Sequence, residues 1–180
     1  MEFTQFPKIP RLYRDCIITE KIDGTNASIY ISEDSQTIQA GSRTRWITPE
    51  DDNFGFAAWV AAHREELSQL GPGHHFGEWW GGKIQRGYGM KEKQFSLFHT
   101  HGIAHKPDCV SVVPTLYTGP FSTEAVEVAL QNLRTHGSYA APFMNPEGVV
   151  VFHLASRHVY KVTLDNDGQP KGVVDGKTSA

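Results

Sequence analysis

The sequence predicts an α+β domain built mostly from antiparallel sheets, with flanking helices. Short runs rich in β-branched and aromatic residues recur along the chain and are bounded by turn residues. Only two segments have apolar residues at helical spacing, and they do not alternate with strands as helices do in parallel sheets. With 180 residues, the chain is long enough for one domain with a real hydrophobic core.

Residues 1–100 are expected to contain five strands and one helix. Apolar side chains recur at helical spacing over 54–70, after three candidate N-caps, Asp51, Asp52 and Asn53. The glycine-rich segment 81–89 predicts a loop. The five strands are expected at residues 15–21, 27–33, 36–41, 75–80 and 94–99.

The second half is expected to begin with a strand and a helix. Residues 110–117 predict a strand that Pro114 interrupts, because proline has no N–H to donate to a sheet. Ser122 is a typical N-cap for a helix over 123–135, which Gly137 is expected to end.

The last elements predicted are two strands, 148–153 and 157–163, around a turn. Residues 165–180 are rich in Asp, Gly, Lys and Pro and predict a loose tail. We therefore expect one domain over 1–164 and a tail over 165–180 that is too short for an OB-fold or another accessory domain.

The composition is that of an ordinary globular protein, with 39% hydrophobic and 21% charged residues. With a net charge of −3, the chain lacks the strong basic excess that is typical of proteins binding polyanions over their whole surface. A local basic groove is still compatible with this net charge. No apolar run approaches the ~20 residues that span a bilayer, and the start lacks signal-peptide features, so no membrane partner is expected. Cys16 and Cys109 are too few for a disulfide framework, which favours reduced thiols and a cytoplasmic location.

Lys21 is the first candidate functional residue. It ends the first expected strand, directly before the Asp23-Gly24 turn and a second strand. This position holds its amine at a fixed point beside backbone that a ligand can approach closely. A lysine in such a place is a candidate nucleophile, provided that its surroundings let it lose its proton.

Six short motifs follow one another along the chain and indicate a shared site. Each is weak by itself, because patterns of three to five residues occur by chance. Their order and spacing make the set specific. In chain order they are Lys21-Ile22-Asp23-Gly24, Ser42-Arg43-Thr44-Arg45, Phe76-Gly77-Glu78-Trp79, Phe95-Ser96-Leu97-Phe98, Glu147-Gly148-Val149-Val150-Val151 and Tyr160-Lys161-Val162.

This ordered set closely resembles the covalent nucleotidyltransferase superfamily of polynucleotide ligases and capping enzymes. The segment from Glu20 to Ile29 is most similar to the RNA ligase 2-like group, and the resemblance extends to about Thr163. It implies a ligase-type nucleotidyltransferase (adenylation) domain that uses ATP and Mg²⁺ or Mn²⁺. Such an RNA ligase transfers AMP to its own lysine, then to a 5′-phosphate RNA end, and seals that end to a 3′-hydroxyl, for example in a nicked duplex.

The resemblance also implies three catalytic residues. Lys21 is the nucleophile that attacks the α-phosphorus of ATP, and Lys161 neutralises charge on the α-phosphate in the transition state. Glu147 binds the divalent metal, for which few carboxylates suffice when ATP phosphates and water complete the shell. Gly148 is expected to leave space there for close approach.

Two polar residues are expected on the nucleoside side. Arg43 matches the family arginine that contacts the ribose and phosphates, and Arg45 is an alternative because S-R-T-R offers two registers. Glu78 matches the carboxylate that accepts from the ribose hydroxyl or helps Glu147 to hold the metal. A structural ion pair is the alternative for Glu78, because a buried carboxylate needs a fixed partner.

The remaining nucleotide contacts implied are those of Glu20, Ile22, Asn26 and Phe98. Glu20 is expected at the adenine edge and Asn26 at the β- and γ-phosphates. Phe98 matches the aromatic residue that stacks on the adenine, an interaction worth on the order of 1–3 kcal/mol. Whether Phe98 or Phe95 is the stacking residue is open, since residues three apart on a strand point to opposite faces. The alternative is that both rings lie in the core.

The chain departs from the family pattern in two places. Relatives often have K-x-K where this chain has Lys161 alone, with Thr163 two residues later, and Arg157 or Lys171 are candidate substitutes. Relatives often have Asp after the stacking aromatic, where this chain has His99. The alternative functions are a DNA ligase, a capping-type guanylyltransferase, or a nucleotide- or RNA-end-binding module with reduced catalysis.

Overall fold

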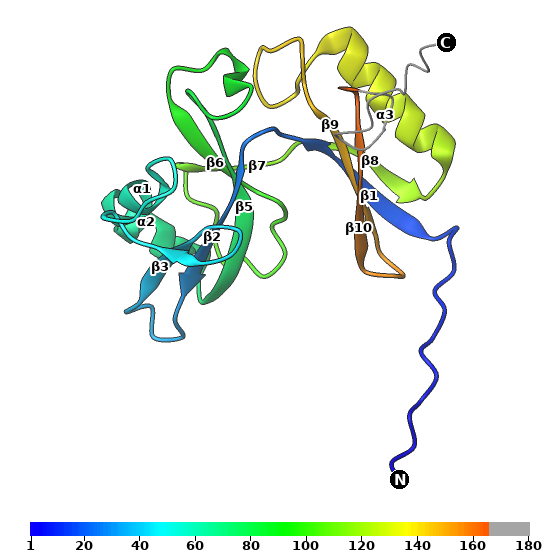
Figure 1. Cartoon of the computed structure of the whole chain (residues 1–180), viewed down its shortest axis with the longest axis horizontal. Helices are drawn as coiled ribbons and strands as arrows, with labels where there is room; N and C mark the ends of the chain where they lie inside the picture. The colour runs from blue at the N-terminus through cyan, green and yellow to red at the C-terminus, as the bar shows by residue number, and fades with distance from the viewer. Residues whose placement is uncertain (166–180) are drawn as a thin grey trace, which may run out of the picture.

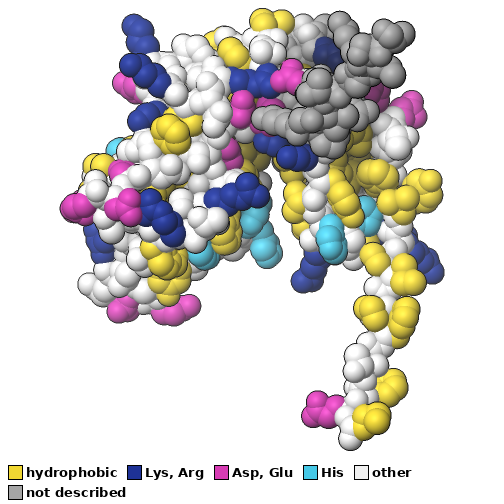
Figure 2. Space-filling view, in the orientation of Figure 1, with side chains coloured by type: hydrophobic (Ala, Val, Ile, Leu, Met, Phe, Trp, Pro, Cys, Tyr) yellow, Lys and Arg dark blue, Asp and Glu magenta, His cyan; other side chains and the backbone are white. Residues whose placement is uncertain are grey.

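The computed structural model describes residues 1–165, which form two lobes around two β-sheets (Figure 1). Each sheet is covered by helix on its outer face. The inner faces are turned toward each other, and the space-filling surface is hollowed between the lobes (Figure 2). This α+β arrangement of largely antiparallel sheets with flanking helices is the fold class that the sequence predicts.

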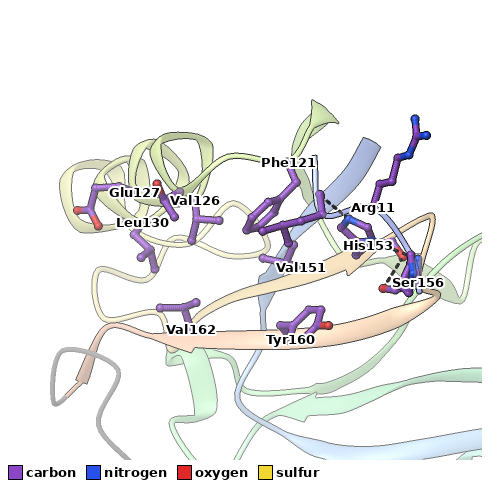
Figure 3. Close-up of a pocket in the computed structure, with 13 residues that line it drawn as sticks. Arg11, Phe121, Val126, Glu127, Leu130, Val151, His153, Ser156, Tyr160 and Val162 are labelled. Atoms are coloured by element: carbon purple, nitrogen blue, oxygen red, sulfur yellow. Dashed lines mark hydrogen bonds between the residues drawn. The ribbon is translucent and has the colours of Figure 1, made fainter. Parts of the chain in front are cut away.

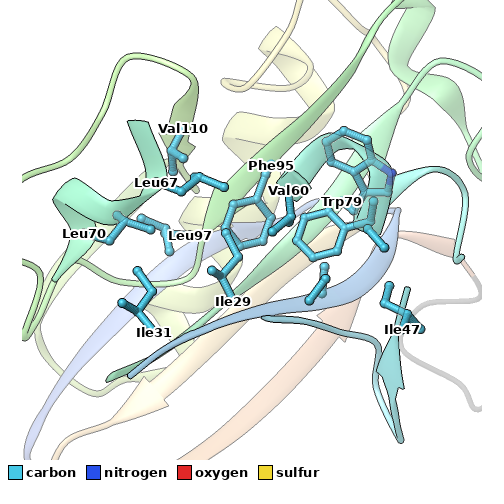
Figure 4. Close-up of a cluster of buried hydrophobic side chains, with 14 of the residues drawn as sticks. Ile29, Ile31, Ile47, Val60, Leu67, Leu70, Trp79, Phe95, Leu97 and Val110 are labelled. Carbon is cyan, nitrogen blue, oxygen red and sulfur yellow. The ribbon is translucent and has the colours of Figure 1, made fainter. Parts of the chain in front are cut away.

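The larger sheet has the strand order β4-β3-β2-β5-β6-β7, in which only the β6–β7 pair is parallel. On its outer face, Ile29, Trp79 and Phe95 pack with Val60 and Leu67 of the helices (Figure 4). Its strands are β2 (Thr25–Ile31), β3 (Ile38–Gly41), β4 (Trp46–Ile47), β5 (Gly73–Gly81), β6 (Lys93–Leu97) and β7 (Val110–Val112).

The smaller sheet has the strand order β10-β9-β1-β8 and is antiparallel throughout. Helix α3 (Thr123–His136) covers its outer face, where Leu130 and Leu133 pack with Ile18 and Val151. Its strands are β1 (Asp15–Lys21), β8 (Thr115–Pro120), β9 (Gly148–His153) and β10 (His158–Thr163).

The prediction of one strand over 110–117 is wrong, because the chain changes sheet there. β7 belongs to the larger sheet and β8 to the smaller one. Pro114 lies between them, and its carbonyl accepts a hydrogen bond from the Glu20 N–H at 2.9 Å. Val113 next to it packs with Ile22 and Trp80 in a small cluster where the two lobes meet.

The continuous helix predicted over 54–70 is also wrong. The chain turns out of the α-helical conformation at His63, whose ring stacks on Trp59 at 4.7 Å. Asp52, one of the predicted caps, accepts a hydrogen bond from the Ala57 N–H at 2.8 Å. The segment therefore consists of α1 (Phe56–Ala62), α2 (Arg64–Leu67) and a 3₁₀ turn (Ser68–Leu70).

The other predicted elements are confirmed with end shifts of at most two residues. The predicted cap Ser122 accepts from the Ala125 N–H at 3.0 Å, and α3 ends at Gly137, which has a φ of 78°. The short strand β4 was not expected, since two residues carry no periodic signal.

Apart from Asp165, the predicted tail lies outside the described residues. No helix in the described part of the chain has the length and apolar character to cross a membrane.

Candidate active site

The centre of the candidate site is an ion pair between Lys21 and Glu147. Lys21 is the last residue of β1 and is paired in register with Gly148, the first residue of β9. Glu147, which directly precedes β9, therefore lies beside Lys21. Lys21 Nζ donates to Glu147 Oε2 at 2.6 Å, across 126 residues of sequence. Glu147 is buried, while Lys21 remains partly accessible. The structure thus brings together the predicted nucleophile and the predicted metal ligand.

Glu78 faces this pair from the larger sheet. It lies on the inner face of β5, because its neighbours Gly77 and Trp79 point toward the outer core. Its carboxylate accepts from the Gly24 N–H at 3.1 Å and from Asn26 Nδ2 at 3.4 Å. Burial raises the pKa of Glu78 to about 7, while the nearby Lys21 charge opposes that rise. Glu78 therefore has fixed partners, but they are a backbone amide and an asparagine.

The raised pKa of Glu78 predicts a pH-dependent stability difference between the wild type and Glu78→Gln. The pKa of this carboxyl group rises from 4.5 in the unfolded chain to about 7 in the folded protein. The folded protein is therefore most stable, as far as Glu78 is concerned, below pH 4.5, where the group is protonated in both states. That contribution is lost as the pH rises to about 7. Glutamine does not ionise, so we expect Glu78→Gln to gain stability over the wild type by up to about 3 kcal/mol between pH 4 and pH 8.

Urea unfolding of both proteins at pH 4, 6 and 8 measures this difference. Other titrating groups cancel in the comparison, because they are present in both proteins. Parallel curves for the two proteins across this range would contradict the expected burial of the Glu78 charge.

Asn26 lies next to Glu78 on the inner face, and Arg43 lies on the turn that follows β3. Asn26 is exposed on β2 and is paired in register with Glu78. Gly41 is paired with Ser28, so the turn that follows β3 carries Arg43 toward the level of Asn26. Arg45 makes a bidentate pair with Asp51 at 2.5 and 2.9 Å, whereas Arg43 is exposed on the turn. Of the two predicted registers, the structure favours Arg43 at the site.

The two phenylalanines of the fourth motif have opposite surroundings. Phe95 is fully buried in the outer core, whereas Phe98 is 40% exposed. Phe98 directly follows β6 and donates its N–H to the Phe76 carbonyl at 3.0 Å, which places it opposite Phe76 on the inner face. Phe98 is therefore the accessible ring, and the alternative with both rings in the core is wrong. His99 beside it is exposed.

Lys161 is exposed on the inner face of β10, since Tyr160 and Val162 line the opposite face toward α3. The register places Thr163 beside Gly148 and hence in line with Lys21, while Lys161 is level with Thr19. Lys161 is thus two residues, or about 7 Å, along the strand from the row of Lys21. Of the suggested substitutes, Arg157 lies at the far end of the hairpin and Lys171 lies outside the described residues.

Glu20 and Ile22 flank Lys21 but point elsewhere. The Glu20 carboxylate accepts from the Tyr139 N–H at 2.8 Å, and its Oε1 is buried with no partner among the described residues. Burial raises the pKa of Glu20. The Ile22 side chain is buried with Trp80 and Tyr88, so only its backbone is available to a nucleotide.

Two glycines of the motifs are required by the protein itself. A Cβ on Gly24 would lie 2.5 Å from the Trp79 carbonyl, because the link from β1 to β2 crosses directly over β5. A Cβ on Gly148 would lie 2.2 Å from the Val162 carbonyl, and its φ is 153°. The space that the sequence assigns to ligand approach at Gly148 is therefore taken up by β10.

Arg86, in the glycine-rich loop, holds the two halves of the site together. Its Nε donates to Asp23 Oδ2 at 3.0 Å, and its Nη1 donates to the Asn145 carbonyl at 3.0 Å. A further hydrogen bond joins Nη2 to Asp165. In the same loop, the buried Tyr88 accepts from the Asp23 N–H at 3.0 Å. Arg86 and Tyr88 therefore both bind the segments that carry Lys21 and Glu147.

We expect Arg86→Ala to lower the free energy of unfolding by about 3 kcal/mol, because it leaves Asp23 and a carbonyl without their partner in a largely buried place. Chemical unfolding measures the loss. Arg134→Ala is the matched control, since Arg134 makes only an exposed pair with Glu127 and should cost less than about 1 kcal/mol. Equal, small losses in both variants would show that Arg86 does not join these segments.

The chemistry of the site fits a divalent cation held jointly with phosphates. No group of three metal-binding side chains occurs within residues 1–165. Mg²⁺ and Mn²⁺ need only one or two carboxylates when phosphate oxygens and waters fill the other positions. Glu147 and Glu78 offer hard oxygen donors on facing sheets beside Lys21.

A separate apolar pocket of about 510 Å³ lies behind the smaller sheet (Figure 3). Val126 and Leu130 of α3 face Tyr160 and Val162 of β10 across it. Lys21, Glu147 and Lys161 do not line this pocket, which is on the opposite side of the sheet from Lys161. It is therefore not part of the candidate active site.

Comparison with solved structures identifies the class of fold. A lysine-to-methionine mutant of Naegleria gruberi RNA ligase with AMP and Mn aligns with a TM-score of 0.57 and 21% identity, over 84% of this chain and 50% of that one. An arginine-to-alanine mutant with ATP and Mn aligns with a TM-score of 0.54 and 17% identity, over the same shares. The fold is that of the RNA ligase nucleotidyltransferase domain, and this chain spans about half the length of those relatives.

The family follows from the sequence itself. The RNA ligase family model matches residues 14–163, which include all six motifs. The chain belongs to the RNA ligase family. A search of curated proteins finds no significant match.

Proposed function

We propose that this protein is an ATP-dependent RNA ligase that works through a covalent lysyl-AMP intermediate. The observation that carries the proposal is the Lys21–Glu147 pair at 2.6 Å, with Glu78 facing it from the other sheet. A lone accessible lysine at a strand end is common on protein surfaces. A lysine beside a buried carboxylate between two sheets, in a chain of the RNA ligase family, is a candidate nucleophile. Because the ion pair favours the charged amine, Lys21 must lose a proton before it attacks.

The reaction begins with attack of Lys21 Nζ on the α-phosphorus of ATP. Nζ must first give up a proton, and Glu147 Oε2 is placed to accept it. The new P–N bond forms as the bond to the pyrophosphate oxygen breaks, and pyrophosphate leaves. A bound Mg²⁺ or Mn²⁺ ion would neutralise the negative charge on the phosphates. Lys161, on the same inner face, would add positive charge from the side of β10.

Two further transfers complete the joining. An oxygen of the RNA 5′-phosphate attacks the AMP phosphorus, the P–N bond breaks, and Lys21 regains its proton. The 3′-hydroxyl of the second RNA end then attacks the activated 5′-phosphate, loses its proton, and displaces AMP. Each step needs in-line geometry and neutralised charge more than covalent help from the protein.

The inner face of the larger sheet would hold the nucleoside. Phe98 supplies an accessible flat ring for the adenine, and Glu78 can hydrogen-bond the ribose or bind metal with Glu147. Arg43 and Asn26 would meet ribose and phosphate oxygens. Glu20 would take part at the adenine edge through its backbone, because its carboxylate points away from this face toward Tyr139.

The test is incubation with α-labelled ATP and Mg²⁺ or Mn²⁺, followed by denaturation. We expect an acid-labile label on the protein from ATP and no label from GTP. A label from GTP would instead indicate a capping-type enzyme. Nicked duplexes with RNA or DNA on the 3′-hydroxyl side then distinguish an RNA ligase from a DNA ligase. No adduct with either nucleotide would overturn the proposal and leave a nucleotide- or RNA-end-binding module.

A further inference from the structure

A row of aromatic side chains extends from the candidate site along the inner face of the larger sheet. Alternate residues of β5 point to this face, which places His74 and Phe76 on the same side as Glu78. On β2, Tyr30 shares the face with Asn26, and Trp46 joins it from β4. The opposite face of these strands is filled by the hydrophobic core.

Three of these rings form a continuous stack, which we call the aromatic platform: Trp46, His74 and Phe76. Trp46 and His74 are 5.5 Å apart with an interplanar angle of 18°, and His74 and Phe76 are 4.4 Å apart at 29°. Tyr30 contacts His74 edge-on at 6.0 Å, and Ser28 Oγ lies 3.2 Å from the His74 ring nitrogen. The central ring is thereby fixed in orientation.

The two outer rings of the platform are accessible, with Trp46 46% and Phe76 48% exposed. Each therefore has exposed ring surface that a ligand can contact. Exposed apolar side chains that form a contiguous patch mark binding surfaces more often than single ones do. Burial lowers the pKa of His74, which favours the uncharged form of the central ring.

The position of the platform indicates what binds there. Phe76 is next to Glu78 on the same face of β5 and opposite Phe98, so the platform continues directly from the proposed nucleotide site. Arg43 stands on the turn between β3 and β4, close in sequence to Trp46, and offers a cation for a phosphate backbone. Aromatic faces with nearby cations are the usual means of binding single-stranded nucleic acid without sequence preference.

We propose that the aromatic platform stacks the bases of the single-stranded RNA segment adjoining the end to be joined. This assignment rests on the proposed ligase function for its substrate. It adds a binding surface for the RNA chain that is separate from Lys21, Glu147 and Phe98. Because stacking uses the faces of the bases, binding is tolerant of base sequence.

The experiment measures the affinity of the full chain for a 5′-phosphorylated, 3′-fluorescent RNA 12-mer by anisotropy. We expect Trp46→Ala and Phe76→Ala each to weaken binding about tenfold, the loss typical of one stacking contact. Phe3→Ala, an exposed ring on the N-terminal segment, is the matched control and should bind as the wild type does. An abasic oligomer of equal length should bind all four proteins alike.

A second readout does not depend on folding of the alanine variants. RNA should quench the tryptophan fluorescence of the wild type more than that of Trp46→Phe, which keeps a ring in the stack. Unchanged affinity in both alanine variants, or the same loss with the abasic oligomer, overturns the proposal. The first of these results would indicate that another protein covers the platform.

The labelling assay with α-labelled ATP separates this proposal from the proposed function. We expect Trp46→Ala, which lies outside the six motifs, to form the lysine adduct at the wild-type level while losing affinity for RNA. A wild type that forms no adduct but binds RNA through the platform would overturn the ligase function alone.

Discussion

Replacing Lys21 with alanine is expected to abolish the covalent AMP adduct, with a loss on the order of a thousandfold or more in labelling rate. The reason is that, among residues 1–165, no other side chain is positioned to take its place. The nucleophile must be a nitrogen at the end of β1, between Glu147 and Glu78. Lys161 is on the same face but two strands away, beyond β9.

Two further variants make this result specific. Lys21→Arg keeps a cation opposite Glu147 and so preserves the ion pair, but a guanidinium does not lose its proton and cannot attack phosphorus. It should therefore fold normally and remain unlabelled. Lys83→Ala removes an exposed lysine from the neighbouring loop and should label as the wild type does. An adduct that survives in Lys21→Ala would sink the proposed mechanism.

The second large effect is expected for Glu147→Ala, with a loss of about a hundredfold in the rate of lysine adenylation. Glu147 is the only carboxylate that hydrogen-bonds Lys21 Nζ among the described residues. Its removal takes away the acceptor for the lysine proton and a hard oxygen donor for the divalent cation, and losing such a ligand commonly costs about two orders of magnitude. Single-turnover labelling at several Mn²⁺ concentrations measures both effects.

The controls for Glu147 address stability and chemistry separately. Glu127→Ala removes an exposed carboxylate from α3 and should leave labelling unchanged. Glu147→Asp keeps the charge on a shorter side chain and should recover part of the rate at high Mn²⁺. Unfolding curves for each variant show whether the fold is intact. Near-normal labelling of Glu147→Ala, and likewise of Lys161→Ala, would mean that the metal and phosphate roles are assigned to the wrong residues.

Much of the fold can be predicted from sequence where local signals decide it. Strands β1 and β9 were predicted with their observed ends, because apolar residues there are bounded by turns and glycine. Ser122 was predicted as a cap and accepts the Ala125 N–H, since capping depends on residues only three apart. The errors occurred where contacts between distant residues decide the structure. At Pro114, whose carbonyl accepts from the Glu20 N–H, one predicted strand is divided between two sheets.

The candidate site shows the same division. The motif residues Lys21, Glu78, Phe98, Glu147 and Lys161 can be picked out from the order of short patterns, and the structure gathers them around the inner faces of two sheets. The sequence left the choices between Phe95 and Phe98 and between Arg43 and Arg45 open. Burial of Phe95 and pairing of Arg45 with Asp51 favour the other residue in each case.

What the sequence alone determined is the class of fold and the set of candidate site residues, because both depend on residue type and on spacing within short segments. The tertiary structure alone decided which of those residues meet. The Lys21–Glu147 pair joins positions 126 residues apart, and Arg86 holds the loops around it through Asp23 and Asn145. The three stacked rings of the aromatic platform come from separate segments as well. Contacts of this kind arise from strand register and packing between distant segments, which no local pattern of the chain encodes.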